Sequence, residues 1–112
     1  MSKANKMKKI EIERWQTIPI LKGLEHLMSV ESSHWLQLVK NHKSIRQVYD
    51  ETLEMVKVAE SDSIPEDEKS KRVEEINTDK VELKLYQFAS DEFSQLKMKG
   101  SVLMPLFDVV LN

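Results

Sequence analysis

The sequence predicts a mainly α-helical fold, a small helical domain with a long central helix and a minor two-stranded β element. Two observations support this fold class. Only two glycines and three prolines occur in 112 residues, fewer than a sheet protein with many turns needs. Apolar residues also recur at intervals of three and four, as they do along one side of a helix. We expect a flexible polar tail at residues 1–6 and a single helical domain at residues 7–112.

Two short segments alternate polar and apolar residues, which is the pattern of a half-buried strand. The first is MKKIEI, residues 7–12, and the second is VELKLYQF, residues 81–88. Two isolated strands are marginal unless they pair and are covered. We therefore expect these two segments to pair, which would join the start of the domain to its later part.

A first helix is expected from about Arg14 to Met28. Pro19 falls near its first turn, where a missing N–H group costs least. The apolar positions, three or four residues apart, are Trp15, Ile18, Leu21, Leu24 and Leu27 or Met28. Because Trp15 is in phase with the leucines, we expect it in the core.

The longest helix is expected between Ser33 and Glu60. Its predicted seam, with alternating steps of three and four, consists of Trp35, Leu38, His42, Ile45, Tyr49, Thr52, Val56 and Ala59. This spacing places all of them on one side of the helix. Such a helix would be ~40 Å long, whereas a compact chain of this size has a radius of gyration of about 13 Å. We therefore expect the helix to extend beyond its own core.

A third, weakly amphipathic helix is expected from Glu66 to about Lys80, folded back on the long helix. Pro65 and the acidic residues that follow it are typical of a helix start. The main apolar anchors of this helix are Val73 and Ile76. These two anchors are too few to cover the distal half of the long helix.

A final apolar helix is expected after Gly100, and it ends in LMPLFDVVLN, residues 103–112. A C-terminus this apolar either docks on its own core or is offered to a partner as an amphipathic helix. Docking is the favoured alternative. Phe107 tests it, because truncating a buried phenylalanine costs about 3 to 5 kcal/mol.

The histidines do not predict a metal site. His34 and His42 are eight residues apart, which on a helix means ~12 Å of rise and about 80° of rotation, so they cannot hold one ion. Glu31 and His34 form one Glu-x-x-His pair, but a di-iron bundle needs two such pairs and two further glutamates. His42 is interpreted as a partly buried, hydrogen-bonded core histidine rather than a general base. No metal or cofactor is expected.

Composition excludes or disfavours several function classes. The chain has no cysteine, which excludes thiolate catalysis and cysteine metal sites. It has neither a Gly-x-Ser-x-Gly elbow nor a glycine-rich phosphate loop, so no enzyme activity and no catalytic residue are expected. A net charge of −2 gives no general attraction to nucleic acid. No run approaches the ~18 apolar residues that span a bilayer, so we expect a cytoplasmic protein without membrane contact.

The order of the predicted strands and helices resembles that of a known class of proteins. A short MKKIEI strand, a leucine-rich helix, one long helix, an acidic helix, a VELKL strand and the closing SDEFSQLKMKGSVLMPLFDVVL together look like small uncharacterised helical proteins encoded by tailed bacteriophages. The resemblance is one of pattern across most of the chain. It implies an accessory viral protein that works in the host cytoplasm, and it carries over no catalytic or binding residue.

Two functions follow as hypotheses. The first is a non-enzymatic protein-interaction module that self-associates as a dimer, by antiparallel packing of the long helices, and serves phage assembly or inhibits a host factor. Its expected interaction residues are Trp35, His42, Tyr49, Leu53, Val56 and Phe107. The alternative is a small-ligand or nucleotide-binding protein with a pocket between helices. In that case His42, Tyr49 and the basic tail would supply the polar contacts.

Overall fold

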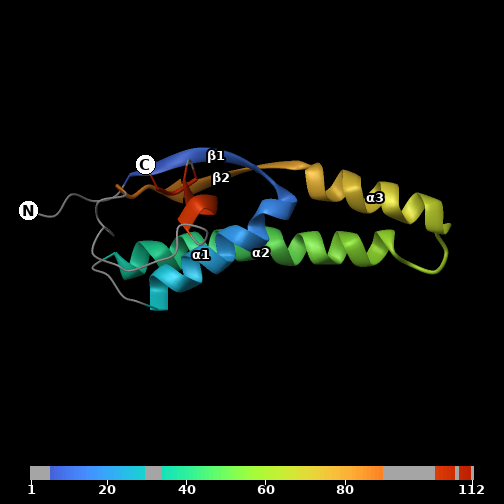
Figure 1. Ribbon diagram of the computed structural model, residues 1–112, viewed down its shortest axis with the longest axis horizontal. Coiled ribbons are helices and arrows are strands. Elements are labelled where there is room, and N and C mark those ends of the chain that lie inside the picture. The colour runs from blue at the N-terminus through green and yellow to red at the C-terminus, as the bar shows by residue number, and fades with distance from the viewer. Residues whose placement is uncertain (1–5, 30–33, 90–102, 108, 112) are drawn as a thin grey trace, which may run out of the picture.

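Three helices and a two-stranded antiparallel sheet form the part of the chain that the computed structural model describes, residues 6–29, 34–89, 103–107 and 109–111 (Figure 1). The helices and strands, in chain order, are β1 (Met7–Glu13), α1 (Thr17–Ser29), α2 (Trp35–Ala59), α3 (Glu66–Thr78) and β2 (Lys80–Tyr86). This architecture confirms the predicted fold class, including the long central helix and the small sheet.

The two strands pair in the register that their alternation favours. Ile10 lies opposite Leu83 and Ile12 lies opposite Val81. Both isoleucines are buried, as is Leu85, because this face of the sheet covers the helices. The opposite face carries charged side chains and remains exposed.

The core lies between the sheet, α1, the first half of α2 and the C-terminal segment. Its most buried members are Ile12, Ile20, Leu24, Leu27, Leu38, Ile45, Leu85, Phe88, Leu106, Val110 and Leu111. Trp15 does not belong to it, and its expected core position is wrong. Residues Arg14–Gln16 form a separate 3₁₀ helix, η1, which has about three residues per turn. The phase of α1 therefore does not extend back to Trp15.

Asn41 fixes α2 to the sheet. Its side chain is buried, and its Nδ2 donates to the carbonyl oxygen of Tyr86 over 2.9 Å while its Oδ1 accepts from the Tyr86 N–H over 2.8 Å. The amide therefore pairs with both polar groups of one strand residue, as a neighbouring strand would. Because both groups would cost free energy if buried without partners, this contact sets the position of α2 along β2.

A helical hairpin, residues 50–79, projects from this body. The distal half of α2 and all of α3 run side by side beyond α1 and the sheet (Figure 1), and the molecule measures 57 × 25 × 19 Å. Pro65 ends the connecting turn, and its carbonyl accepts from the N–H groups of Glu68 and Lys69 at 3.0 Å each. No residue of α3 is buried, and its predicted anchors Val73 and Ile76 are half-buried.

The C-terminal segment is docked, as favoured, but helical structure ends at Leu106, earlier than expected. Leu103 is α-helical, Met104–Leu106 form a 3₁₀ turn, η3, and Phe107 is already extended. The chain then turns so that the carbonyl of Val110 accepts from the Phe88 N–H over 2.7 Å. Because the turn reverses the chain after Leu106, Leu106 is buried whereas Phe107 is 44% exposed. The expected burial of Phe107 is wrong, and residues 100–102 lie outside the described chain.

Candidate interaction surface

Four of the six expected interaction residues lie on one side of α2. His42, Tyr49, Leu53 and Val56 are separated by seven, four and three residues, which keeps them in line along the helix. α1 packs over the first half of this line, where Tyr49 is half-buried and adjoins the core. The line then passes into the hairpin, where Val56 is half-buried and Leu53 is 42% exposed. Only this distal part is available to a partner.

His42 faces α1 rather than solvent. Its Nε2 lies 3.8 Å from Glu25 Oε1, and its side chain is 21% exposed. The partial burial expected for His42 is confirmed. The expected hydrogen bond is absent at Nε2, which has no such partner among the described residues. His42 therefore adjoins one carboxylate from α1.

Trp35 and Phe107 are not brought to the hairpin. Trp35 lies in the first turn of α2 and is 51% exposed, so its expected place in the packed seam is wrong. Periodicity fixes the side of a helix on which a residue lies, but not whether another element covers that residue. Phe107 follows η3 at the C-terminal segment. The expected interaction residues therefore do not form one continuous patch.

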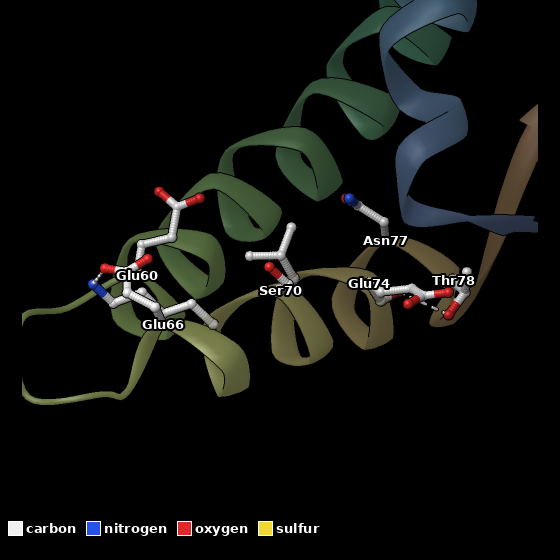
Figure 2. A pocket seen from close by; sticks show the side chains of 8 residues that line it. Glu60, Glu66, Ser70, Glu74, Asn77 and Thr78 are labelled. Atoms are coloured by element: carbon white, nitrogen blue, oxygen red, sulfur yellow. Dashed lines mark hydrogen bonds and ion pairs between the residues drawn. The ribbon is translucent and has the colours of Figure 1, made fainter.

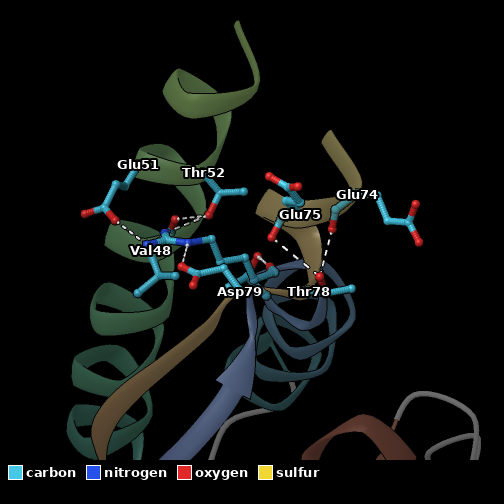
Figure 3. A network of polar contacts seen from close by, with 9 residues as sticks. Val48, Glu51, Thr52, Glu74, Glu75, Thr78 and Asp79 are labelled. Atoms are coloured by element: carbon cyan, nitrogen blue, oxygen red, sulfur yellow. Dashed lines mark hydrogen bonds and ion pairs between the residues drawn. The ribbon is translucent and has the colours of Figure 1, made fainter. Parts of the chain in front are cut away.

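An arginine network at the base of the hairpin was missed by the sequence analysis. Figure 3 shows Glu51 and Thr52 on α2 and Asp79 after α3, and the side chains of all three contact the guanidinium of Arg14. Arg14 Nη2 lies 2.8 Å from Glu51 Oε1, and Nε lies 2.9 Å from Asp79 Oδ2. Nη1 donates to Thr52 Oγ1 over 3.2 Å. One side chain thus connects the end of β1 to both helices of the hairpin.

The electrostatics of this network favour the charged arginine. Burial acts to lower the pKa of Arg14, but hydrogen bonds and charge attraction from Asp79 and Glu51 outweigh it and raise the pKa above its ordinary value. The contact between Arg14 and Asp79 could have been predicted from the pairing of the two strands. Once the two strands are paired so that Glu13 lies opposite Lys80, the flanking residues Arg14 and Asp79 become neighbours.

A polar groove follows one side of the contact between α2 and α3 (Figure 2). Its volume is about 650 Å³, and it is lined by Glu60, Glu66, Lys69, Ser70, Val73, Glu74, Asn77 and Thr78. Lys69 Nζ is 2.9 Å from Glu66 Oε1, which leaves Glu60 and Glu74 as additional negative charges along this groove. No group of three or more His, Cys, Asp or Glu side chains within the described chain could hold a metal ion.

The other side of the hairpin is more apolar. A groove of about 530 Å³ is lined there by Met55, Val58, Ala59, Arg72, Glu75, Ile76 and Asp79. Val58 on its rim is 69% exposed. The groove adjoins the arginine network through Asp79, so its inner end is held by Arg14. The hairpin therefore combines a base held by the ion pairs of Arg14 with exposed apolar side chains.

The chain matches no protein-family model, and no curated protein or solved structure is significantly similar to it. Within the described residues, no helix has the length and apolar character needed to cross a bilayer.

Proposed function

We propose that this protein is a non-enzymatic protein-interaction module that self-associates through its projecting hairpin. The observation that carries the proposal is the combination of projection and exposed apolar side chains. Leu53, Met55 and Val58 all remain exposed on the hairpin, and α3 contributes no buried residue to cover them. A pair of helices with so little of its own core is typically completed by packing against a further surface.

Comparing the free energy gained by apolar burial with the cost of association indicates how strong the self-association should be. Full burial of one such side chain stabilises by about 1.5 to 3 kcal/mol, and these three are already partly covered. Association of two molecules costs roughly 4 to 15 kcal/mol in lost freedom. Apolar burial on the hairpin alone therefore supports weak binding, and polar or charged contacts must supply the remainder.

The small-ligand alternative has less support. Tyr49 lines a shallow notch of about 260 Å³ between α1 and α2, together with Ile18, Leu21, Lys22, Glu25 and Arg46. Ligand pockets in proteins usually have volumes of about 300 to 1,000 Å³. His42, the second expected polar contact, does not line this notch, although its Nε2 lies 3.8 Å from Glu25, which does. The basic tail at residues 1–5 lies outside the described chain.

The biological setting belongs to the same proposal. The order of elements resembles that of small helical proteins of tailed bacteriophages, which suggests an accessory role in the cytoplasm of the host cell. Self-association would then serve assembly, or it would present several copies of the hairpin to a host factor. No catalytic step and no cofactor enter this mechanism, since binding by surface burial is sufficient.

Light scattering on matched variants tests the proposal. The wild-type protein at tens of micromolar should show an average mass above the 13.1 kDa of one chain. Val58→Asp on the hairpin should lower that mass towards the monomer. Ile18→Asp is the control, because Ile18 is also about half exposed but lies on α1. A wild-type mass of one chain, or equal effects of both substitutions, would contradict the proposal.

A further inference from the structure

The charges of the molecule are strongly separated along its length. Between Asp50 and Asp79 the chain has eleven acidic and four basic residues, a net charge of −7, whereas the rest of the sequence has a net charge of +5. The hairpin occupies one end of the long axis of the molecule, and the sheet lies towards the other (Figure 1). A net charge of −2 for the whole chain conceals this polarity.

Four exposed lysines lie around the end of the sheet where β1 begins and β2 ends. We call this end of the sheet the sheet patch, and its residues are Met7, Lys8, Lys9, Lys40, Lys84 and Tyr86. Lys8 pairs with Leu85 and therefore projects from the face opposite to Lys9 and Lys84. The strand register places Lys9 opposite Lys84 and Met7 opposite Tyr86. Lys40 extends from α2, with its Nζ 5.9 Å from the centre of the Tyr86 ring. All four lysines are exposed, and Met7 is half exposed.

The sheet patch carries an internal electrostatic cost. Like charges directly opposite each other on paired strands are destabilising, and Lys9 and Lys84 are such a pair. Glu82 compensates in part, since its Oε1 lies 3.6 Å from Lys9 Nζ. An acidic partner would relieve the remaining repulsion, and the apolar surface of Met7 would be buried with it.

We propose that the hairpin of one copy docks on the sheet patch of a second copy, head to tail. This inference rests on the proposed self-association and identifies its second surface. Charge complementarity selects the occupant. The residues of the hairpin sum to −7, and the hairpin remains strongly acidic after Arg14 and Arg46, which lie outside it, pair with Glu51, Asp79 and Asp50. Such a surface is repelled by the same surface of another copy and attracted by the lysines of the sheet patch. The antiparallel pairing of two hairpins would instead bring the acidic surfaces together.

Head-to-tail docking has two measurable consequences. The two surfaces differ, so the interface is heterologous, and every assembly that does not close into a ring keeps one free hairpin and one free sheet patch at its ends. The average mass should therefore keep rising with concentration rather than stop at a dimer. Because the attraction is between exposed charges, raising the salt from about 50 mM to about 500 mM should weaken association at least tenfold.

Neutralised variants of the full chain test the inference by sedimentation velocity. The sheet variant carries Lys8→Gln, Lys40→Gln and Lys84→Gln, and the hairpin variant carries Glu60→Gln, Asp62→Asn and Glu75→Gln. All six residues are exposed, and thermal melting of each variant confirms that it remains folded. Each variant alone should associate at least tenfold more weakly than the wild type. An equimolar mixture should form discrete dimers, since each pair then contains one native interface.

The outcomes separate this inference from the proposed function. If the sheet variant associates as the wild type does while the hairpin variant does not, self-association holds and the head-to-tail arrangement is wrong. If the mixture fails to form dimers, the arrangement is also wrong. A wild-type protein that remains monomeric at low salt, with a sheet patch that binds phosphatidylserine vesicles or an oligonucleotide instead, overturns both.

Discussion

Arg14 joins three segments that lie far apart in the sequence. Its guanidinium contacts Glu51 and Asp79, and its own backbone N–H donates to the Asp79 carbonyl over 3.0 Å. The Arg14 carbonyl also accepts from Thr17 Oγ1 over 2.8 Å at the start of α1. Arg14 therefore fixes the returning end of the hairpin, at Asp79, against α2, whose continuous helix leads out of the body.

Arg14→Ala should lower the free energy of unfolding by about 2 to 3 kcal/mol, because hydrogen bonds to charged groups contribute about 1.5 to 3 kcal/mol each and the two partly exposed carboxylates regain water. Urea unfolding followed by circular dichroism measures the loss. Arg46→Ala is the control, since Arg46 forms an exposed pair with Asp50 on one helix, which typically contributes less than about 1 kcal/mol. Equal losses for the two variants would show that Arg14 stabilises the protein no more than an exposed ion pair does.

Asn41→Leu should cost about 2 to 4 kcal/mol, since it leaves the N–H and the carbonyl of Tyr86 without their buried partner. Hydrogen exchange gives a local readout, because the Tyr86 amide donates to Asn41 Oδ1 in the native protein. Its exchange should accelerate more than that of amides within the ladder between β1 and β2. Gln47→Ala, at an exposed position of the same helix, should change neither quantity. Unchanged exchange at Tyr86 in Asn41→Leu would show that the contact is dispensable.

At the scale of elements, the C-terminal segment completes the core through residues on both sides of a turn. Leu106, Val110 and Leu111 are buried, and the Gln87 side-chain Nε2 donates to the Val109 carbonyl over 2.8 Å. A helix would have placed Phe107 and Val110 on one side, three residues apart. The turn separates them instead.

Leu106→Ala should therefore destabilise the protein by about 2 to 5 kcal/mol, the range for truncating a buried leucine. Phe107→Ala should cost less than about 1 kcal/mol, because Phe107 is 44% exposed and truncation leaves no cavity. The two melting temperatures, measured at the same protein concentration, decide between these expectations. A larger loss for Phe107→Ala than for Leu106→Ala would mean that the segment docks in a different way.

Periodicity predicted the elements better than it predicted their surroundings. The seam of α2 is confirmed for Leu38, Ile45 and Ala59, which are all buried, and the alternation in the two strands gave their pairing. Trp35 has the phase of the buried residues but remains exposed. Its burial depends on whether another element packs over it, which the periodicity of its own helix does not reveal. Asn41 and Arg14 were missed since a single polar residue has no period, and its partners become visible only after the strands are paired.

For the whole molecule, shape and charge support the same interpretation. The radius of gyration is 16.2 Å, larger than the roughly 13 Å of a compact domain of about 100 residues, because the hairpin extends beyond the body. The same hairpin holds most of the negative charge, and the lysines of the sheet patch lie towards the other end. Elongation therefore separates two complementary surfaces that cannot reach each other within one chain.

Zero-length crosslinking between carboxylates and lysines is the most direct measurement of this arrangement. A mixture of unlabelled and ¹⁵N-labelled protein distinguishes links between copies from links within one copy by mass. We predict mixed-isotope links that join Lys8, Lys9, Lys40 or Lys84 of one copy to acidic residues of the hairpin in another. Links between copies that join hairpin to hairpin only, or links confined to single copies, would contradict the head-to-tail account.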